Sequence, residues 1–252
     1  MAQVDSELRN TGVEGKVRVD KQQVRPVVFA GITLSHAEIR AALGTAEVRP
    51  PVRWGDLDQL DDGRIVSIID GELHGAALLP ADEIRRAIAR GIDVRGASSL
   101  GALRAAELRH EGMRGIGWVY DAFCTGRIRG IDEIAVIYDP YSYRPLTVPL
   151  VNVRFCLDGL VSRRAITAGE AAVAMKALRS ITLEERDPGT VVMRLTEIAG
   201  RRRISALLER IRGQQFDIKA MDAQLLLNDL SQAGRSDGVF YPASAATTHG
   251  CT

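Results

Sequence analysis

The chain has 252 residues, of which 46% are hydrophobic and 26% charged, as is ordinary for a globular protein with a full core. Its formal net charge of +1 gives no reason to expect nucleic acid or a membrane surface as a partner. No apolar run approaches the roughly 18 residues of a membrane span, and the N-terminal segment lacks the apolar core of a signal peptide. We therefore expect a cytoplasmic protein.

Cysteine and histidine usage indicates no metal site. Cys124, Cys156 and Cys251 are widely spaced and odd in number, so neither a disulfide framework nor a zinc knuckle is predicted. The histidines are equally scattered. We expect no metal and no cofactor.

Apolar runs alternate with helical patterns in the first half of the chain. Three such runs are typical of buried parallel strands: 27–30, 65–69 and 92–95. A helix is predicted where Ser35 and Glu38 have capping-box spacing, and another at 80–90, which Gly91 ends. The alternation predicts an α/β fold with a small parallel-type sheet and flanking helices, followed by a helical C-terminal region.

The chain divides into four expected parts. These are a flexible arm (1–24), an α/β core (25–150), a helical region that packs on the core (151–232) and a disordered tail (233–252). Within them, 132–138 is a candidate further strand and 113–126 includes a short helix. Thr167 and Glu170 have the spacing of a second capping box.

The most informative segment joins the third strand to the next helix. It is Gly96-Ala97-Ser98-Ser99-Leu100-Gly101, a turn of small residues with two adjacent serines. A hydroxyl there lies beside unpaired N–H groups at a helix N-terminus, which stabilise an anion. The turn suits a nucleophile with an oxyanion site or a phosphate cradle, although a serine in this place most often caps the helix. Gly31 and Asp70 also follow strands, where ligands of parallel sheets bind.

A base for such a serine is harder to find. His74 lies near a strand end but is more typical of a surface loop. Lysine is rare in this arginine-rich chain and occurs only as Lys16, Lys21, Lys176 and Lys219. Unlike arginine, a desolvated lysine can lose its proton near neutral pH. Lys176 lies in a segment of small apolar residues and is the candidate base, although a lysine on a helix usually extends to solvent.

One long block, Gly96–Leu108, occurs together with several shorter segments. These are Gly55-Asp56-Leu57, Ile69-Asp70-Gly71, Gly112-Met113, Asp132–Val136, Tyr143–Leu146 and Val151–Arg154. On these residues the chain, from about Val27 to Arg186, closely resembles TfuA-like proteins, the partners of YcaO enzymes in peptide thioamide formation. It departs from the family at Ile181–Arg186, where an aromatic residue more often precedes the arginine.

The resemblance implies an accessory hydrolase in the biosynthesis of modified peptides (RiPPs). Such a protein would hydrolyse a thiocarboxylated, ThiS-like sulfur carrier and deliver sulfide to YcaO. The serine–lysine site of the family matches the Ser98-Ser99 turn and Lys176. We expect Ser99 to be the nucleophile because it directly precedes the helix, with Ser98 as the reserve candidate or the cap. The N–H groups of Leu100 and Gly101 are the expected oxyanion donors.

The remaining assignments keep alternatives open. Asp70 is expected to orient the lysine or to bind the carrier tail, or only to serve in a turn. Arg104 and Glu107 are expected to contact the carrier or the serine turn, or to pair with each other at i, i+3 spacing. The expected partners are YcaO, the ThiS-like carrier and, as a further candidate, the precursor peptide.

Two other functions compete with the hydrolase. A non-catalytic adaptor would dock the carrier and the peptide onto YcaO. A nucleotide-binding protein fits less well, because the serine turn lacks the GxxxxGK[ST] spacing of a phosphate loop.

Overall fold

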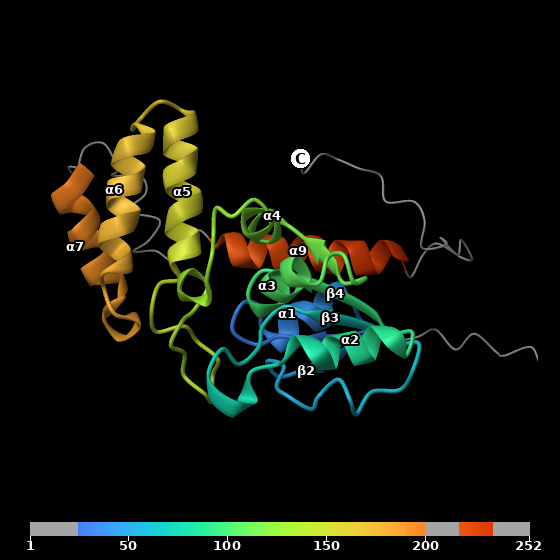
Figure 1. Cartoon of the computed structure of the whole chain (residues 1–252). Coiled ribbons are helices and arrows are strands. Elements are labelled where there is room, and N and C mark those ends of the chain that lie inside the picture. Colours follow the sequence, from blue (N-terminus) through green and yellow to red (C-terminus); the bar gives the residue numbers. More distant parts are fainter. Residues whose placement is uncertain (1–24, 200–216, 234–252) are drawn as a thin grey trace, which may run out of the picture.

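The computed structural model describes residues 25–199 and 217–233 (Figure 1). The expected arm (1–24) and the tail beyond Ala233 lie outside the described residues.

A five-stranded parallel sheet forms the centre of the protein, so the predicted α/β class is confirmed. Its strands are β1 (Val27–Phe29), β2 (Glu47–Arg49), β3 (Ile65–Ile68), β4 (Asp93–Ala97) and β5 (Arg114–Ile116), in the spatial order β2-β1-β3-β4-β5. The chain moves to one side of β1 to form β2 and to the other side from β3 onward. The sheet therefore has its topological switch point between β1 and β3, where ligands of such folds bind.

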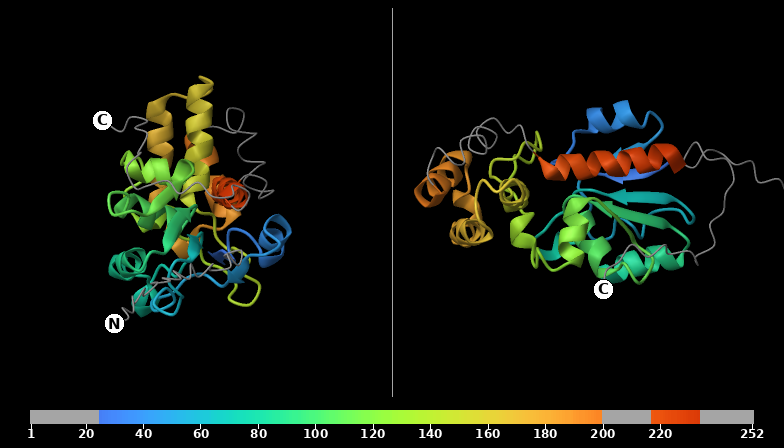
Figure 2. Two further views of the ribbon diagram at one scale, coloured as in Figure 1. Left: turned by 90° about the vertical axis from the view of Figure 1, so that its right-hand side faces the viewer. Right: turned by 90° about the horizontal axis from the view of Figure 1, so that it is seen from above.

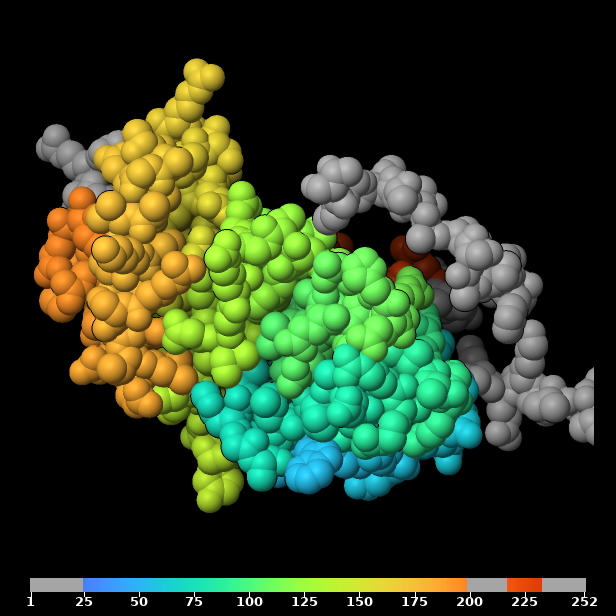
Figure 3. Space-filling model, viewed as in Figure 1, coloured from blue at the N-terminus to red at the C-terminus, as the bar shows by residue number. Residues whose placement is uncertain are grey.

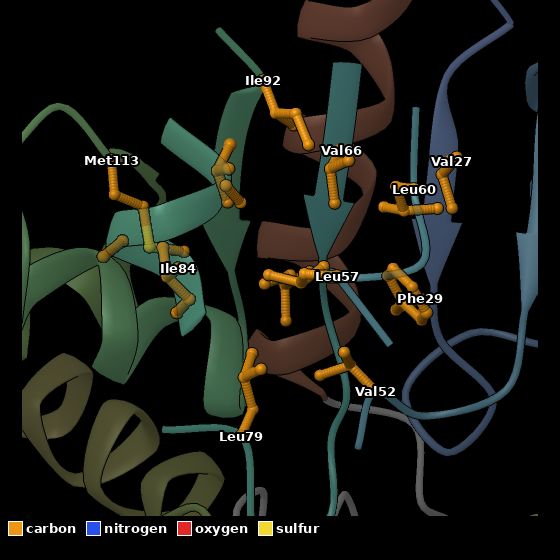
Figure 4. Packing of buried hydrophobic residues seen from close by; sticks show 14 of the residues in the cluster. Val27, Phe29, Val52, Leu57, Leu60, Val66, Leu79, Ile84, Ile92 and Met113 are labelled. Atoms are coloured by element: carbon orange, nitrogen blue, oxygen red, sulfur yellow. The ribbon is translucent and has the colours of Figure 1, made fainter. Parts of the chain in front are cut away.

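Helices cover both faces of the sheet (Figure 2). The helices α2 (Ala81–Ala89) and α3 (Leu100–Glu107) cover one face, where Phe29, Ile68 and Ile84 belong to one buried cluster (Figure 4). On the other face, α1 (His36–Ala42) and α9 (Ile218–Ala233) pack against side chains of the opposite parity. Because successive strand residues point to opposite faces, a buried parallel strand is apolar throughout.

Three helices form a separate unit beside the sheet (Figures 1 and 3). They are α5 (Leu150–Ser162), α6 (Ala168–Arg179) and α7 (Pro188–Ala199), and they share a hydrophobic cluster that includes Leu157, Leu178 and Leu195. The short helix α4 (Trp118–Cys124) and the 3-10 turns Gly75–Ala77, Ile131–Glu133 and Leu183–Glu185 complete the described elements. No helix in these described ranges is long and apolar enough to cross a membrane.

Local sequence signals set several element boundaries. Both capping boxes are present, Ser35 with Glu38 at α1 and Thr167 with Glu170 at α6. Gly91 follows the end of α2 with a φ of +79°, a conformation that glycine adopts without strain. These predictions are confirmed. They could be made from the sequence because each depends on residues within one helical turn.

The expected strand at 132–138 is wrong. A 3-10 turn ends at Glu133, and the carboxylates of Asp132 and Glu133 bind the arginines Arg186 and Arg154. Ile134 is fully buried in a loop that packs against α4 and α5. These side-chain contacts, rather than the backbone hydrogen bonds of a strand, hold the segment in place.

The close approach of α3 to β3 can be tested at Gly101. A Cβ at this position would lie 1.8 Å from the Ile68 carbonyl oxygen, which is backbone and cannot yield. We expect Gly101→Ala to lower the free energy of unfolding in urea by at least about 3 kcal/mol. The control is Gly44→Ala, where a Cβ meets open space, and its effect should stay within about 1 kcal/mol. Equal unfolding midpoints for both variants would contradict this packing.

Candidate active site

Ser98 occupies a sharp turn between β4 and α3. Its φ is +71°, in the left-handed region that residues other than glycine rarely adopt. The flanking glycines permit the turn, because a Cβ on Gly96 would lie 2.1 Å from the Gly101 carbonyl oxygen. A serine on a strained strand-to-helix turn is the arrangement that presents a nucleophile at the end of an α/β sheet.

Ser99 begins α3 but does not cap it. It occupies the N-cap position, and its side chain makes no capping hydrogen bond. The Gly101 N–H points toward the Ile69 carbonyl oxygen at 3.5 Å, whereas the Leu100 N–H has no acceptor among the described residues. Of the two expected oxyanion donors, Leu100 is therefore the one available to a ligand.

Asp70 is a fully buried carboxylate at the end of β3. Its Oδ2 accepts hydrogen bonds from the N–H groups of Gly31 (3.1 Å), Ile32 (3.0 Å) and Thr33 (2.8 Å). These three residues follow β1, so Asp70 bridges the two strands at the switch point of the sheet. Its role is larger than that of a turn residue.

Thr33 connects Asp70 to the serine turn. Its hydroxyl donates to Asp70 Oδ1 at 2.6 Å, and its Oγ1 lies 3.3 Å from Ser98 Oγ. Because the Thr33 proton is committed to the carboxylate, the Ser98 hydroxyl is left to donate to Thr33. A chain of hydrogen bonds thus orients Ser98, whereas no such partner exists for Ser99 within the described ranges.

Lys219 is buried on the first turn of α9, with 3% of its surface exposed. Its Nζ donates to the carbonyl oxygen of Ile134 at 3.1 Å and forms no salt bridge within the described part of the chain. Burial lowers the pKa of Lys219, and the negative charges of Asp70 and Asp217 oppose that shift. A buried lysine without a carboxylate partner can lose its proton and act as a base.

Asp222 fixes this end of α9, one turn beyond Lys219. Its two carboxylate oxygens accept from the N–H groups of Trp118 (2.9 Å) and Val119 (2.7 Å), at the start of α4. Burial raises the pKa of Asp222 to about 6. The carboxylate therefore joins two helices that are far apart in the sequence.

The structure does not bring Lys176 to the serine turn. Lys176 is exposed on α6, in the unit of α5, α6 and α7 that lies beside the sheet (Figures 1 and 2). Its neighbours Met175 and Leu178 are buried instead, so the lysine extends to solvent. The structure therefore does not place Lys176 where it could pair with Ser98 or Ser99.

Arg104 and Glu107 pair with each other, as the alternative reading of their spacing expects. The guanidinium lies 2.6 Å from the Glu107 carboxylate and also donates to the Leu79 carbonyl oxygen. His74 is exposed ahead of a 3-10 turn. None of these three side chains joins the network around Asp70.

A loop covers the end of the sheet above Asp70. Tyr143, with a φ of +58°, packs on Gly31, where a Cβ would lie 3.2 Å from the tyrosine ring. Its ring stacks between His36 and Tyr138, with centroid separations of 6.2 Å and 6.0 Å. Tyr138 in turn donates to Glu72 at 2.8 Å. This aromatic stack therefore packs beside Gly31, in the loop whose N–H groups bind Asp70.

Sequence reasoning missed Thr33 and Lys219. The rarity of lysine pointed equally to Lys219, which lies in Asp217-Ile218-Lys219-Ala220 at the start of a helix. Only burial distinguishes it from Lys176, and burial depends on how α9 packs against the sheet. Thr33 carried no signal, because a lone threonine after a strand is common.

The described ranges contain no group of three histidine, cysteine, aspartate or glutamate side chains that could hold a metal ion. The polar side chains linked to Ser98 are instead the Thr33 hydroxyl and, through it, the Asp70 carboxylate. Such a set suits proton transfer to and from a nucleophile.

Comparison with known proteins identifies one family. Residues 70–187 match the profile of the family described as TfuA-like protein. No curated protein matches the chain. The matched region includes Asp70 and the serine turn, whereas Thr33 and Lys219 lie outside it.

The raised pKa of Asp222 predicts a pH-dependent stability. Its folded pKa of about 6 exceeds the ordinary value of 3.8, so the folded state holds a proton that the unfolded state releases between these values. The contribution of Asp222 is thus greatest below about pH 4 and falls by about 2–3 kcal/mol as the pH rises to 7. Asp222→Asn should remove this pH dependence. The free energy of unfolding in urea should therefore shift in favour of the variant, relative to the wild type, as the pH rises. A difference in the free energy of unfolding between variant and wild type that stays constant from pH 4 to pH 7 would contradict this prediction.

Proposed function

The chain is a TfuA-like protein over residues 70–187, and from that membership we propose that it releases sulfide for peptide thioamidation. The family suggests a role with a YcaO enzyme in this modification. The finer proposal is a thiocarboxylate hydrolase that acts on a ThiS-like sulfur carrier. The observation that carries it is the buried Lys219 amine, whose pKa the charge of Asp70 affects, while Asp70 itself is hydrogen-bonded through Thr33 to Ser98.

Ser98 is the nucleophile in this proposal, in place of Ser99. The strained turn and the hydrogen bond to Thr33 both act on Ser98, whereas Ser99 has neither. The base is Lys219, in place of Lys176, because a lysine amine must be desolvated to be neutral near pH 7.

The proposed reaction proceeds through an acyl-enzyme. In this proposal the Ser98 proton leaves its hydrogen bond to Thr33 and passes to neutral Lys219 as the hydroxyl oxygen attacks the carbonyl carbon of the carrier thiocarboxylate. The Leu100 N–H stabilises the oxyanion. The ammonium then returns its proton to the departing sulfur, which leaves as hydrosulfide. Water attacks the acyl-serine with Lys219 again as base and restores the Ser98 hydroxyl and a free carboxylate.

A carrier can reach Ser98 only if the structure around the serine turn opens. Ser98 is fully buried, and the stack of His36, Tyr143 and Tyr138 lies over the adjacent strand end. This closure also supports the second candidate, an adaptor that docks a carrier and a peptide on YcaO without chemistry of its own. The two functions make opposite predictions for variants of the serine turn.

Four single variants separate the proposed pair from the alternatives. We expect Ser98→Ala and Lys219→Met each to lower sulfide release from a thiocarboxylated ThiS-like carrier by about 10³-fold or more. Ser99→Ala and Lys176→Ala are the matched controls and should stay within a few-fold of the wild type. Thermal unfolding of each variant reports whether it folds.

The contradicting outcomes are distinct. A loss confined to Ser99→Ala and Lys176→Ala would restore the pair expected from the sequence. If all four variants fold and release sulfide as fast as the wild type, the result would support the adaptor function instead.

The charge of Asp70 predicts the direction of a pH shift. Asp70 raises the pKa of Lys219 against the effect of burial, so Asp70→Asn should lower that pKa further. The rising limb of kcat with pH should therefore move to lower pH in Asp70→Asn, because Lys219 becomes neutral earlier. Steady-state sulfide release across pH 6–10 measures it. A limb that stays in place, or moves to higher pH, would exclude Lys219 as the titrating base.

A further inference from the structure

The carboxyl edge of the sheet, where the parallel strands end, displays two exposed aromatic side chains. Of the phenylalanine, tyrosine and tryptophan residues in the described part of the chain, only Trp54 and Tyr141 are exposed, at 62% and 94%. Tryptophan and tyrosine bury a large apolar area when a partner covers them, and they dominate the binding energy of many protein interfaces. Their exposure therefore marks a candidate interaction surface.

The segment of Trp54 is bound to the chain that follows β3. Val52, two residues earlier, donates its N–H to the Asp70 carbonyl oxygen at 3.0 Å and accepts from the Glu72 N–H at 3.1 Å. The Trp54 N–H donates to the Ala77 carbonyl oxygen at 3.0 Å. The backbone at Trp54 is thus attached to the segment that begins with Asp70, the carboxylate of the proposed site.

Tyr141 lies in the loop 138–147, which reaches the end of β1. Tyr143 of this loop packs on Gly31, whose N–H donates to the Asp70 carboxylate. Both exposed aromatic residues therefore belong to segments that contact the surroundings of Asp70, although they are 87 residues apart in the sequence.

Glu72 joins the two segments. Its carboxylate accepts a hydrogen bond from the Tyr138 hydroxyl at 2.8 Å and another from the Arg53 guanidinium at 3.1 Å. The side chain of Arg53 is otherwise largely in solvent, and arginine is the third residue type that is enriched among energetically dominant interface residues. The exposed side chains of the two segments form what we call the aromatic rim: Arg53, Trp54, Tyr141 and Leu146.

Carboxylates hold both segments of the aromatic rim in place. The buried carboxylate of Glu83 accepts from the N–H groups of Gly55 and Leu57, both at 2.8 Å. The Asp139 carboxylate accepts from the Tyr141 N–H at 2.9 Å. Because the backbone that carries the aromatic side chains is already ordered, a partner that binds them loses little conformational entropy in the segments.

We propose that the aromatic rim binds the folded body of the ThiS-like sulfur carrier while the terminal thiocarboxylate of the carrier reaches Ser98. This inference rests on the proposed function, which supplies the partner. Ligands of a parallel sheet enter beyond the carboxyl ends of its strands, so a protein that inserts its C-terminus there lays its body against the same edge. The aromatic rim offers such a protein an apolar surface at that edge.

The binding test uses the full chain and the carrier in its unmodified carboxylate form, titrated by calorimetry. We expect the double variant Trp54→Ala, Tyr141→Ala to raise the Kd about tenfold or more, because each truncation removes a large contact area. The control is Val173→Ala, Met193→Ala, at residues that are 57% and 56% exposed on α6 and α7, in the helical unit beside the sheet. It should bind as the wild type does.

Sulfide release from the thiocarboxylated carrier gives a second readout. The rim variant should raise KM for the carrier and leave kcat unchanged, because binding of the carrier body is lost while the hydrogen bonds of Ser98 stay intact. Thermal unfolding reports whether the double variant folds. Tyr141→Ala alone keeps the test if it does not, because a side chain that is 94% exposed adds little to the stability of the fold.

The contradicting outcomes separate the aromatic rim from the hydrolase. Equal Kd values for the rim variant and its control would overturn the proposed docking surface. A loss of YcaO binding by the rim variant, with unchanged binding of the carrier, would overturn it as well. Carrier binding that depends on the aromatic rim without any sulfide release by the wild type would instead reject the hydrolase and leave the docking surface in place.

Discussion

The buried carboxylate of Asp70 is the contact on which the proposed site depends. Burying such a group costs several kcal/mol, and its four hydrogen bonds, at about 1.5–3 kcal/mol each, offset that cost. Without the carboxylate, the three backbone N–H groups of Gly31, Ile32 and Thr33 would lose their acceptor. The carboxylate thus shapes the loop of Gly31–Thr33, places Thr33 beside Ser98 and supplies negative charge for Lys219.

Helix α9 completes the site from the other side. Arg95 on β4 is buried and lies 2.6 Å from Asp229 of α9, while Asp222 holds the start of α4. These two contacts fix the helix along its length, so the position of Lys219 follows from the whole helix. The family match ends at residue 187, which means that the proposed base belongs to a part of the chain beyond the matched region.

Local signals in the sequence predicted what local contacts determine. The capping boxes, the helix end at Gly91 and the serine turn between β4 and α3 each depend on a few neighbouring residues. The strands β2 and β5 have three residues each, which is too short for a periodic pattern. The segment after Gly130 carried strand-like residues, but arginines from α5 and beyond α6 bind its carboxylates and hold it as a turn and a loop.

The choice between neighbouring residues required the folded chain. Ser98 and Ser99 are chemically identical, and only the folded chain distinguishes them, by the φ of +71° at Ser98 and by its contact with Thr33. Lys176 and Lys219 are likewise both lysines near helical apolar residues. One extends to solvent because its helix buries Met175 and Leu178 instead, and the other is enclosed where α9 meets Ile134.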